Sequence, residues 1–282
     1  MFICEKGGNM IIEGWKYYNH SAIPTSAPHE RVNLSVIKSG EIWNIEGKKP
    51  LLARWISDFD CGYETEWWYI IKDDCITLDQ CKKKVRKEIR RANDKIDIKV
   101  INPKDYEEEI KRVYHAAVSN YEKPDVSLYL KQIKKAENEE WIGAFERESN
   151  LLIAYKIGRL HKDNVEMITS KVDPEYNCYS PLLAMNYYQI DKYINSGEYR
   201  YLSNGARTIL HQTGYNDYLE NKLGFRKAYC KLNIKYRPKI KLIVCILYLF
   251  RGIFKKLDRY SFIRKINGIL EMEKINRSFC QK

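Results

Sequence analysis

The first third of the chain alternates short apolar runs with polar turns. Four such runs, rich in Val, Ile, Leu and Trp, predict strands at 34–38, 42–45, 51–56 and 67–72. A helix is expected from Thr77 to about Asn93, because Gln80 stands three residues after Thr77, as in a capping box. Val85 and Ile89 fall on one face of this helix, which indicates that one side packs on a core.

A longer and more regular succession of apolar patterns follows. It predicts a strand, two helices, three strands joined as antiparallel hairpins, a helix, a strand, a helix and a final strand. These elements are expected at 96–101, 104–120, 125–137, 141–147, 151–160, 165–172, 180–197, 199–203, 214–223 and 225–236. The order predicts an α+β, α/β-like fold in which helices flank a mixed sheet.

Composition supports a folded protein and excludes several kinds of site. Of the 282 residues 44% are hydrophobic, and 22 Tyr, 6 Trp and 8 Phe give more aromatic surface than a disordered chain carries. Eight cysteines show neither CxxC pairing nor metal-ligand spacing, so we expect no metal site and a reducing, cytoplasmic location. The sequence also lacks a Walker loop, a dinucleotide fingerprint and a nucleophile elbow.

Positive charge is concentrated near the C-terminus. The net charge is +12, and residues 235–282 contain thirteen Lys and Arg against three acids, a net of +10. The same tail holds the apolar run 242–250, which is too short to cross a membrane, since a span needs about 20 residues. Such a basic, apolar helix is typical of a segment on an anionic membrane surface, here the inner face. Packing on the body, a second copy of the chain and nucleic acid such as tRNA are the alternatives, and the oligomeric state stays open.

The acidic stretch DFDCGYETEWW provides the first candidate site. Asp60 and Glu64 are candidates for the catalytic proton acceptor. Asp58, Tyr63 and Trp67 are candidates for substrate binding, because carboxylates hold an ammonium group and aromatic rings stack on a sugar or a cation. The alternative is an acidic turn whose aromatic residues belong to the flanking strands.

A second candidate lies in LSNGARTILHQTG, between a predicted strand and a predicted helix. The carboxyl ends of strands are where clefts open in α/β sheets. His211 is therefore a candidate catalytic base, while Asn204 and Arg207 are candidates for substrate binding. The alternative for a single His is a structural role.

Two further segments are candidates for binding the donor or another anion. Arg86 and Arg90 lie one turn apart in the basic helix KKKVRKEIRRA, which suits a phosphate but also a solvated helix face. Tyr179 and Ser180 precede Pro181 at the start of the 180–197 helix, where the helix dipole favours an anion.

The order of elements over residues 96–236 resembles the GNAT acyltransferase fold, and KLGFRKAYCKL, with Gly224 and Phe225, is similar to the usual close of that fold. Residues 1–94 resemble a shortened, strand-rich second half, as in the Fem-type aminoacyltransferases, which build peptidoglycan cross-bridges from aminoacyl-tRNA. The stretches WKYYNHSAIP and LGFRKAYCKLNIKYRP are similar to uncharacterised GNAT-like proteins of bacterial surface-polysaccharide synthesis. The resemblance implies three parts: 1–94, a GNAT-like domain at 95–237, and a basic amphipathic helical tail at 238–282.

This resemblance implies an acyl- or aminoacyltransferase that joins an activated acyl group to an amine of an amino-sugar or lipid-linked envelope precursor. No cofactor is expected to be tightly bound, and acyl-CoA and aminoacyl-tRNA are the two donors to consider. The segment DPEYNCYSPLL lacks the glycines of the usual CoA loop, and Glu220 stands where many acetyl-CoA members have a Tyr, with Tyr218 two positions away. A catalytically silent module that binds a glycan precursor or a partner enzyme at the membrane is the alternative.

Overall fold

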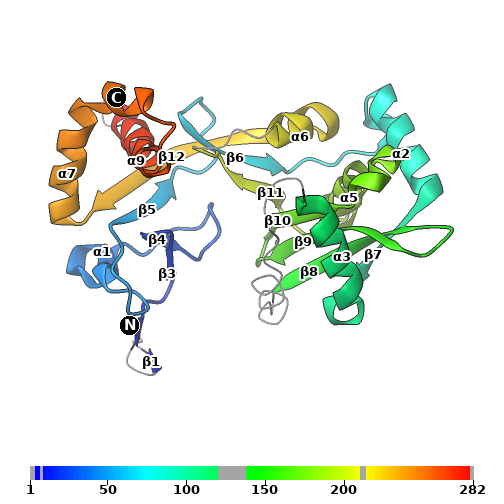
Figure 1. Ribbon diagram of the computed structural model, residues 1–282, viewed down its shortest axis with the longest axis horizontal. Helices are drawn as coiled ribbons and strands as arrows, with labels where there is room; N and C mark the ends of the chain where they lie inside the picture. Colours follow the sequence, from blue (N-terminus) through cyan, green and yellow to red (C-terminus); the bar gives the residue numbers. More distant parts are fainter. Residues whose placement is uncertain (1–3, 7–8, 120–137, 210–213, 280–282) are drawn as a thin grey trace. The chain divides into compact units, whose positions relative to one another are not determined.

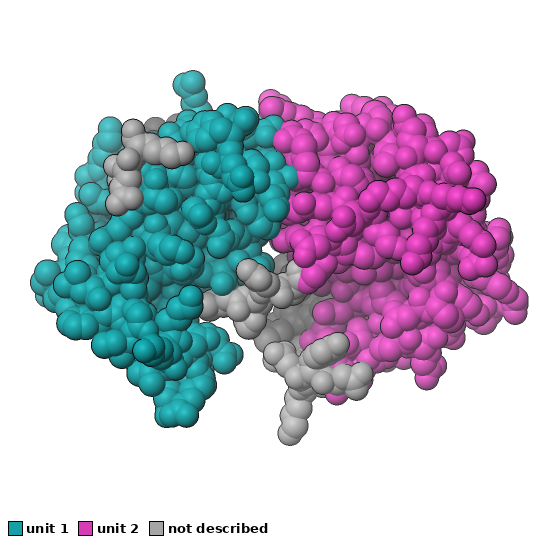
Figure 2. All heavy atoms as spheres, turned by 90° about the horizontal axis from the view of Figure 1, so that it is seen from above, with its two compact units in different colours: residues 1–69, 206–213, 227–282 teal, residues 70–205, 214–226 magenta. Residues whose placement is uncertain are grey.

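The computed structural model describes residues 4–6, 9–119, 138–209 and 214–279 (Figure 1). The chain forms two compact units, coloured separately in Figure 2: unit 1 comprises 1–69, 206–213 and 227–282, and unit 2 comprises 70–205 and 214–226. Both ends of the chain belong to unit 1, so the units do not follow the sequential division at residues 94 and 237. Whether 1–94 is a shortened copy of 95–237 stays a prediction.

Unit 1 is built on a small mixed sheet. Its strands are β1 (Cys4–Lys6), β2 (Asn9–Ile11), β3 (Trp15–Tyr18), β4 (Ser21–Pro24), β5 (Leu52–Ser57), the start of β6 (Trp67–Lys72) and most of β12 (Arg226–Tyr236). Its helices are α1 (Ser35–Ser39), the 3₁₀ turn η1 (Glu41–Trp43), α7 (Pro238–Leu249), α8 (Arg251–Lys256) and α9 (Ser261–Ser278). β3 pairs with β4 antiparallel, β4 with β5 parallel and β5 with β12 antiparallel, while β1 and β2 form a separate hairpin.

Neighbouring residues of β5 face the two sides of this sheet. Ala53 packs in a cluster with Trp15 and Ile42, while Leu52 packs with Val244 of α7 and Leu270 of α9. Because side chains alternate along a strand, one strand serves both cores. The C-terminal helices therefore cover one face of the unit 1 sheet.

The strand predictions for Leu34–Lys38 and Ile42–Ile45 are wrong. These segments form α1 and η1, and the short helix α1 ends at Gly40, whose φ of 85° is the left-handed conformation common after a helix. Val36 and Ile42 are buried in the same cluster, so packing overrides the strand preference of these β-branched residues. The strands at 51–56 and 67–72 are confirmed as β5 and β6, whereas β3 and β4 were not predicted.

Unit 2 combines a mixed sheet with flanking helices. Its strands are β7 (Ile96–Ile101), β8 (Glu139–Glu146), β9 (Leu152–Leu160), β10 (Asn164–Val172) and β11 (Tyr201–Ala206). Its helices are α2 (Lys83–Lys95), α3 (Glu107–Val118), α5 (Pro181–Gln189), the π-helical η5 (Ile190–Asn195) and α6 (Tyr215–Leu223), with 3₁₀ turns η2 (Leu78–Gln80), η3 (Pro103–Tyr106) and η4 (Pro174–Tyr179). The strand order is β7-β8-β9-β10-β11, antiparallel except for the parallel β10–β11 pair.

This order confirms the α+β fold class and the succession predicted for 96–236. The predicted helix at 125–137 lies outside the described residues. Along β8, Trp141 and Phe145 face a core with α3, while Ile142 and Ala144 face a core with α2 and α5. Helices therefore cover both faces of the unit 2 sheet.

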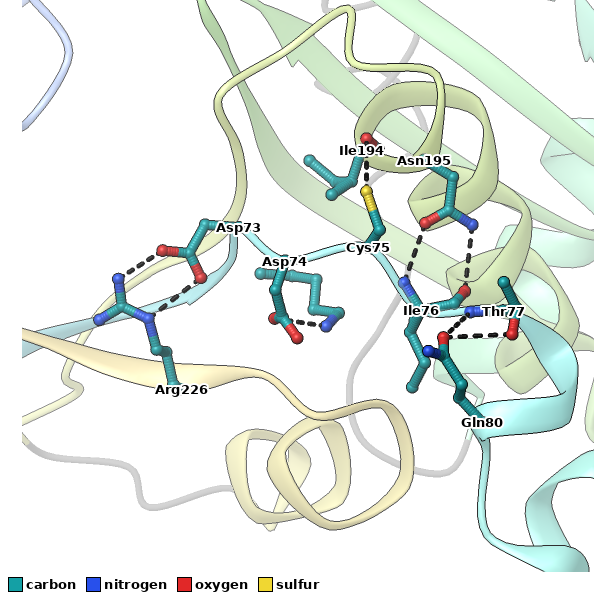
Figure 3. Close-up of polar contacts among 10 residues, drawn as sticks. Asp73, Asp74, Cys75, Ile76, Thr77, Gln80, Ile194, Asn195 and Arg226 are labelled. Atoms are coloured by element: carbon teal, nitrogen blue, oxygen red, sulfur yellow. Dashed lines mark hydrogen bonds and ion pairs between the residues drawn. The ribbon is translucent and has the colours of Figure 1, made fainter.

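The segment after β6 is tied to the end of the α5–η5 helix, as Figure 3 shows. The Ile76 N–H donates to Asn195 Oδ1 at 3.0 Å, and Asn195 Nδ2 donates to the Ile76 carbonyl at 3.0 Å. Thr77 and Gln80 form the predicted capping box, with Thr77 N–H donating to Gln80 Oε1 at 2.8 Å. This box opens the 3₁₀ turn η2, so the α-helix predicted from Thr77 begins only at Lys83. Nearby, Arg226 at the start of β12 forms an ion pair with Asp73. These bonds fix where α2 begins relative to α5.

Gly143 is a position where the unit 2 core has no room for a side chain. A Cβ there would lie 2.9 Å from both Leu152 Cδ1 and Phe145 Cε2. We expect Gly143→Ala to lower the free energy of unfolding by about 1–3 kcal/mol, because overpacking forces neighbours from their positions. Urea denaturation measures this, with Gly252→Ala in α8 as control, since nothing lies within 4 Å of that position. A variant as stable as the parent would contradict the tight packing.

Candidate functional site

Two parallel strands of unit 2 separate where the candidate site lies. β10 pairs with β11 only over Asn164–Glu166, whereas its pairing with β9 continues to Val172. A register shift between Met167 and Thr169 marks a β-bulge at the point of separation, and bulges re-aim the strand that carries them. The carboxyl ends of separating parallel strands are the usual position of a ligand site in α/β sheets.

A buried polar cluster lies on β9, the neighbour of β10. Lys156 is 1% exposed, and its Nζ donates a hydrogen bond to Asn186 Oδ1 of α5. The Tyr215 hydroxyl of α6 donates to the same oxygen at 3.1 Å. Burial lowers the pKa of Lys156 well below its ordinary value, because the charged amine loses its hydration. Three separate elements thus meet around one amide oxygen.

The helix α5 presents further polar atoms to this core. Asn186 Nδ2 and both amide atoms of Gln189 have no hydrogen-bond partner among the described residues, and both side chains are fully buried. Each such group costs about 1–3 kcal/mol, so a cluster of them needs a reason. The helix widens into a π-helical turn directly after Gln189, a feature that is frequent at functional sites.

The helix α6 supplies two phenols. The rings of Tyr215 and Tyr218 stack with centroids 5.8 Å apart at 15°. Burial raises the pKa of Tyr215 to about 12. Burial, followed by the nearby Tyr215 and Glu88, raises the pKa of Tyr218 above its ordinary value. Both phenols therefore keep their protons near neutral pH, and the Tyr218 hydroxyl makes no hydrogen bond to another described residue.

A carboxylate stands at the N-terminus of α5. Glu88 of α2 accepts a hydrogen bond from Ser180 Oγ at 3.1 Å and one from Lys222 Nζ at 2.5 Å. Ser180 precedes the helix in a left-handed conformation, with a φ of 55°. The positive end of the helix dipole favours this carboxylate, and the Lys222 ammonium balances its charge.

The segment before α5 is wound rather than open. Residues Pro174–Tyr179 form η4, which Asp173 caps by accepting from the Glu175 N–H at 3.2 Å. Asp173 also accepts from Arg112 Nη1 of α3 at 2.6 Å. A glycine loop with free amides, as a CoA pyrophosphate requires, is therefore replaced by a closed turn.

The predicted anion-binding residues lie on two segments of unit 2. Arg86 Nη1 donates to the Asp79 carbonyl at 2.9 Å, and Arg90 Nη2 donates to Asp79 Oδ1 at 3.2 Å. Tyr179 is half-buried and packs edge-to-face on Tyr176, with ring centroids 5.8 Å apart. Anion binding by these residues stays a prediction.

The acidic loop between β5 and β6 lies in unit 1, and its carboxylates are exposed rather than pressed against rings. Asp58, Asp60, Tyr63 and Glu64 are all exposed, and Asp58 pairs with Lys231 Nζ at 2.9 Å. Trp67, by contrast, is 3% exposed and belongs to a core cluster, so its ring is not presented to a ligand. The loop is held in place by Thr65 Oγ1, which donates to the Cys230 carbonyl at 2.9 Å.

Arg207 is brought onto the acidic loop. Its Nη1 donates to the Glu66 carbonyl at 2.6 Å and pairs with Glu66 Oε2 at 3.0 Å, so the guanidinium already binds a carboxylate of the chain itself. Asn204 belongs to unit 2, where its Nδ2 donates to Asn216 Oδ1 of α6 at 2.8 Å. His211 lies outside the described residues, so its role as a base stays a prediction.

Asp60→Asn combined with Glu64→Gln is expected to change the free energy of unfolding by no more than about 0.5 kcal/mol. Both side chains are exposed, and Asn tolerates the φ of 57° at Asp60 well. The same variant should weaken binding of an amine-bearing substrate, measured by calorimetry beside urea denaturation. Loss of folding would show that the loop has a structural role.

The fold is a GNAT-like fold of the Fem type. The structure of FemX superposes with a TM-score of 0.54 at 8% identity, covering 80% of this chain and 84% of that one. The C-terminal domain of a protein described as a putative lysylphosphatidylglycerol synthetase, from Agrobacterium fabrum, superposes with a TM-score of 0.50 at 10% identity, covering 87% and 86%. No protein-family model matches the sequence, and no curated protein sequence matches it either. The predicted resemblance is therefore confirmed at the level of the fold.

The cluster around Lys156 was not predicted from the sequence, although signals for it exist. Lys156 interrupts the apolar strand LLIAYKIGRL, and Asn186 and Gln189 stand three residues apart on the buried face of an apolar helix. On α6, Tyr215 and Tyr218 follow the same three-residue spacing. Polar side chains on a buried face need hydrogen-bond partners. This requirement could have indicated that the three segments lie close together.

Proposed function

We propose that this protein is a transferase that joins an activated acyl or aminoacyl group to an amine of an amino-sugar or cell-envelope precursor. The observation that carries the proposal is the polar cluster of Lys156, Asn186 and Tyr215, with Tyr218 beside it. It lies next to the separating parallel strands of a GNAT-like, Fem-type fold. A cluster of this kind costs stability and therefore needs a function.

Acyl transfer requires a nucleophile, a group that donates a proton to the leaving atom, and side chains that hold these groups in position. The substrate amine attacks the carbonyl carbon of the donor and forms the new C–N bond. The bond to the leaving oxygen or sulfur then breaks with its electron pair. That atom takes a proton, and the nitrogen of the new amide releases one to the solvent. Tyr218 suits this step, because its raised pKa keeps it protonated and its hydroxyl is not committed to another described residue. Lys156 and Asn186 act by holding Tyr215, on whose ring Tyr218 is stacked.

The donor side favours an aminoacyl ester over acyl-CoA. The Ser180 hydroxyl at the start of α5 is bonded to Glu88, and the preceding turn η4 is closed by Asp173. Both features reduce the number of free donors for a pyrophosphate there. The exposed face of α2 carries Lys83, Lys84 and other basic residues that would attract a polyanion such as tRNA.

The acceptor side rests on the exposed acidic loop. Asp60 and Glu64 of unit 1 offer carboxylates that would bind an ammonium group of the acceptor. Tyr63 is exposed beside them and offers a ring to a sugar. These features support an amino sugar, free or lipid-linked, as the acceptor.

The test uses the full chain with two donors in parallel. Radiolabelled aminoacyl-tRNA and acetyl-CoA are each incubated with amino-sugar nucleotides and lipid-linked amino sugars, and products are identified by mass spectrometry. We expect transfer from aminoacyl-tRNA and weak or no binding of CoA by calorimetry. Transfer from acetyl-CoA alone would reverse the assignment of the donor, while absence of transfer from either would remove the proposed function.

One observation favours a second candidate, a catalytically silent module that binds a glycan precursor or a partner enzyme at the membrane. The closed turn η4, followed by Ser180 bonded to Glu88, stands where CoA-dependent members of the fold have their glycine loop. If neither donor binds but amino-sugar precursors do, the silent module is the correct assignment.

A further inference from the structure

The C-terminal helices expose an unusual amount of apolar surface. Leu249 is 74% exposed and Phe262 is 72% exposed, and seven more large apolar side chains of the same segment are exposed by more than a third. These are Leu242, Ile243, Ile246, Phe250, Ile253, Leu257 and Tyr260. We call this set the apolar tail surface. Large exposed apolar side chains gathered in one segment of this kind indicate an interaction site.

The helix α7 carries two apolar stripes on opposite sides. Ile240, Val244 and Leu247 pack with α9 on the unit 1 sheet. The inner face of α7 is therefore packed against the body of unit 1. Leu242 and Ile246 belong to the other side and stay exposed. Since the inner stripe already anchors the helix, the outer stripe is not needed to hold the fold together.

Basic residues alternate along the chain with the residues of the apolar tail surface. Residues 238–265 contain eight Lys and Arg against the single acid Asp258, a net of +7. The basic residues are Lys239, Lys241, Arg251, Lys255, Lys256, Arg259, Arg264 and Lys265, and all are exposed. Asp258 is already paired with Arg264 at 3.7 Å.

We propose that the apolar tail surface docks on an anionic lipid bilayer, with α7 and α8 lying in the plane of the headgroups. Apolar side chains enter the boundary of the acyl chains, and the basic residues bind lipid phosphates. No helix in the described ranges is long and apolar enough to cross a membrane. A second copy of the chain fits less well, because a symmetric contact would bring +7 against +7.

The experiment measures sedimentation of the full-length protein with vesicles of phosphatidylcholine, with and without phosphatidylglycerol. We expect binding only to vesicles that contain phosphatidylglycerol, with affinity falling as salt is raised. Leu249→Ser with Phe250→Ser should lower the partition coefficient by about tenfold or more. Lys255→Gln with Lys256→Gln should lower it by roughly fivefold for each charge removed. These four side chains are exposed, so folding should be unaffected, which circular dichroism checks.

Matched controls test whether vesicle binding depends on this surface rather than on any exposed apolar or basic side chain. Val100→Ser removes an exposed apolar side chain of unit 2, and Lys104→Gln with Lys162→Gln removes two exposed charges from the same unit. Both controls should bind vesicles as the parent does. Failure of the parent to bind anionic vesicles, or equal losses in the controls and the tail variants, would overturn the proposal. So would a dimer that Leu249→Ser with Phe250→Ser dissociates, because the surface would then belong to a second copy.

Discussion

Lys156→Met is expected to raise the free energy of unfolding at pH 7 by about 1–4 kcal/mol, the range seen when a buried ion pair is replaced by apolar side chains, because the buried amine carries a similar desolvation cost. Lys156 is 1% exposed, and its Nζ donates a hydrogen bond to Asn186, whose amide carries no charge that would balance an ammonium group. Methionine has a similar length and adapts to irregular cores. Urea denaturation at constant temperature measures the change.

The stability gained in this variant should depend on pH in a defined direction. The pKa of Lys156 is lower in the folded protein than its ordinary value of 10.5, so between the two values the unfolded chain binds more protons. The parent therefore becomes more stable as pH rises through this window, and the advantage of the Lys156→Met variant over it should shrink from pH 7 to pH 10. Lys162→Met, at an exposed turn position, is the matched control and should show no such trend. A destabilised Lys156→Met would mean that the amine contributes to the fold.

The same variant tests the functional role of the cluster. Without the amine, the Asn186 side chain loses one of its two hydrogen-bond donors. Tyr215 donates to the same Asn186 oxygen, so its position is also fixed less firmly. We expect lower kcat with little change in KM for the acceptor, because Lys156 positions other groups and does not touch the substrate. A variant that is more stable and less active would indicate that the cluster is kept for function.

The sequence was informative where local signals and packing agree. Thr77 with Gln80 and the strand Ile96–Ile101 were both predicted, because capping and alternation are local properties. The segment around Val36 and Ile42 was mispredicted, since its helical turns are imposed by contacts with residues distant in the sequence. Propensity alone could not decide this case.

The site was harder to predict than the fold. The acidic loop is conspicuous in the sequence, but its carboxylates are exposed in the structure. Because most carboxylates in proteins are exposed, this observation gives little information about function. Lys156, Asn186 and Tyr215 are separated by 30 and 29 residues, so only the register of β9, α5 and α6 brings them together. A single polar residue in an apolar run becomes informative only when its partner is known.

Tyr218→Phe is expected to reduce kcat for acyl transfer by about 10²–10⁴-fold, the usual contribution of a general acid. The substitution removes one hydroxyl and keeps the ring that stacks on Tyr215. Because that hydroxyl makes no hydrogen bond to another described residue, the free energy of unfolding should stay within about 0.5 kcal/mol of the parent. Initial rates with a poor and a good leaving group measure the effect.

The leaving-group comparison separates a proton donor from a residue that merely shapes the site. If Tyr218 protonates the departing atom, the loss should be large for an alkyl ester and small for an activated aryl ester, whose leaving group needs no proton. Tyr215→Phe is the matched control, since the Tyr215 hydroxyl is bonded to Asn186 at 3.1 Å and its loss should affect both donors alike. Equal losses with both donors in Tyr218→Phe would assign Tyr218 a positioning role, and an unchanged rate would exclude this phenol from the reaction.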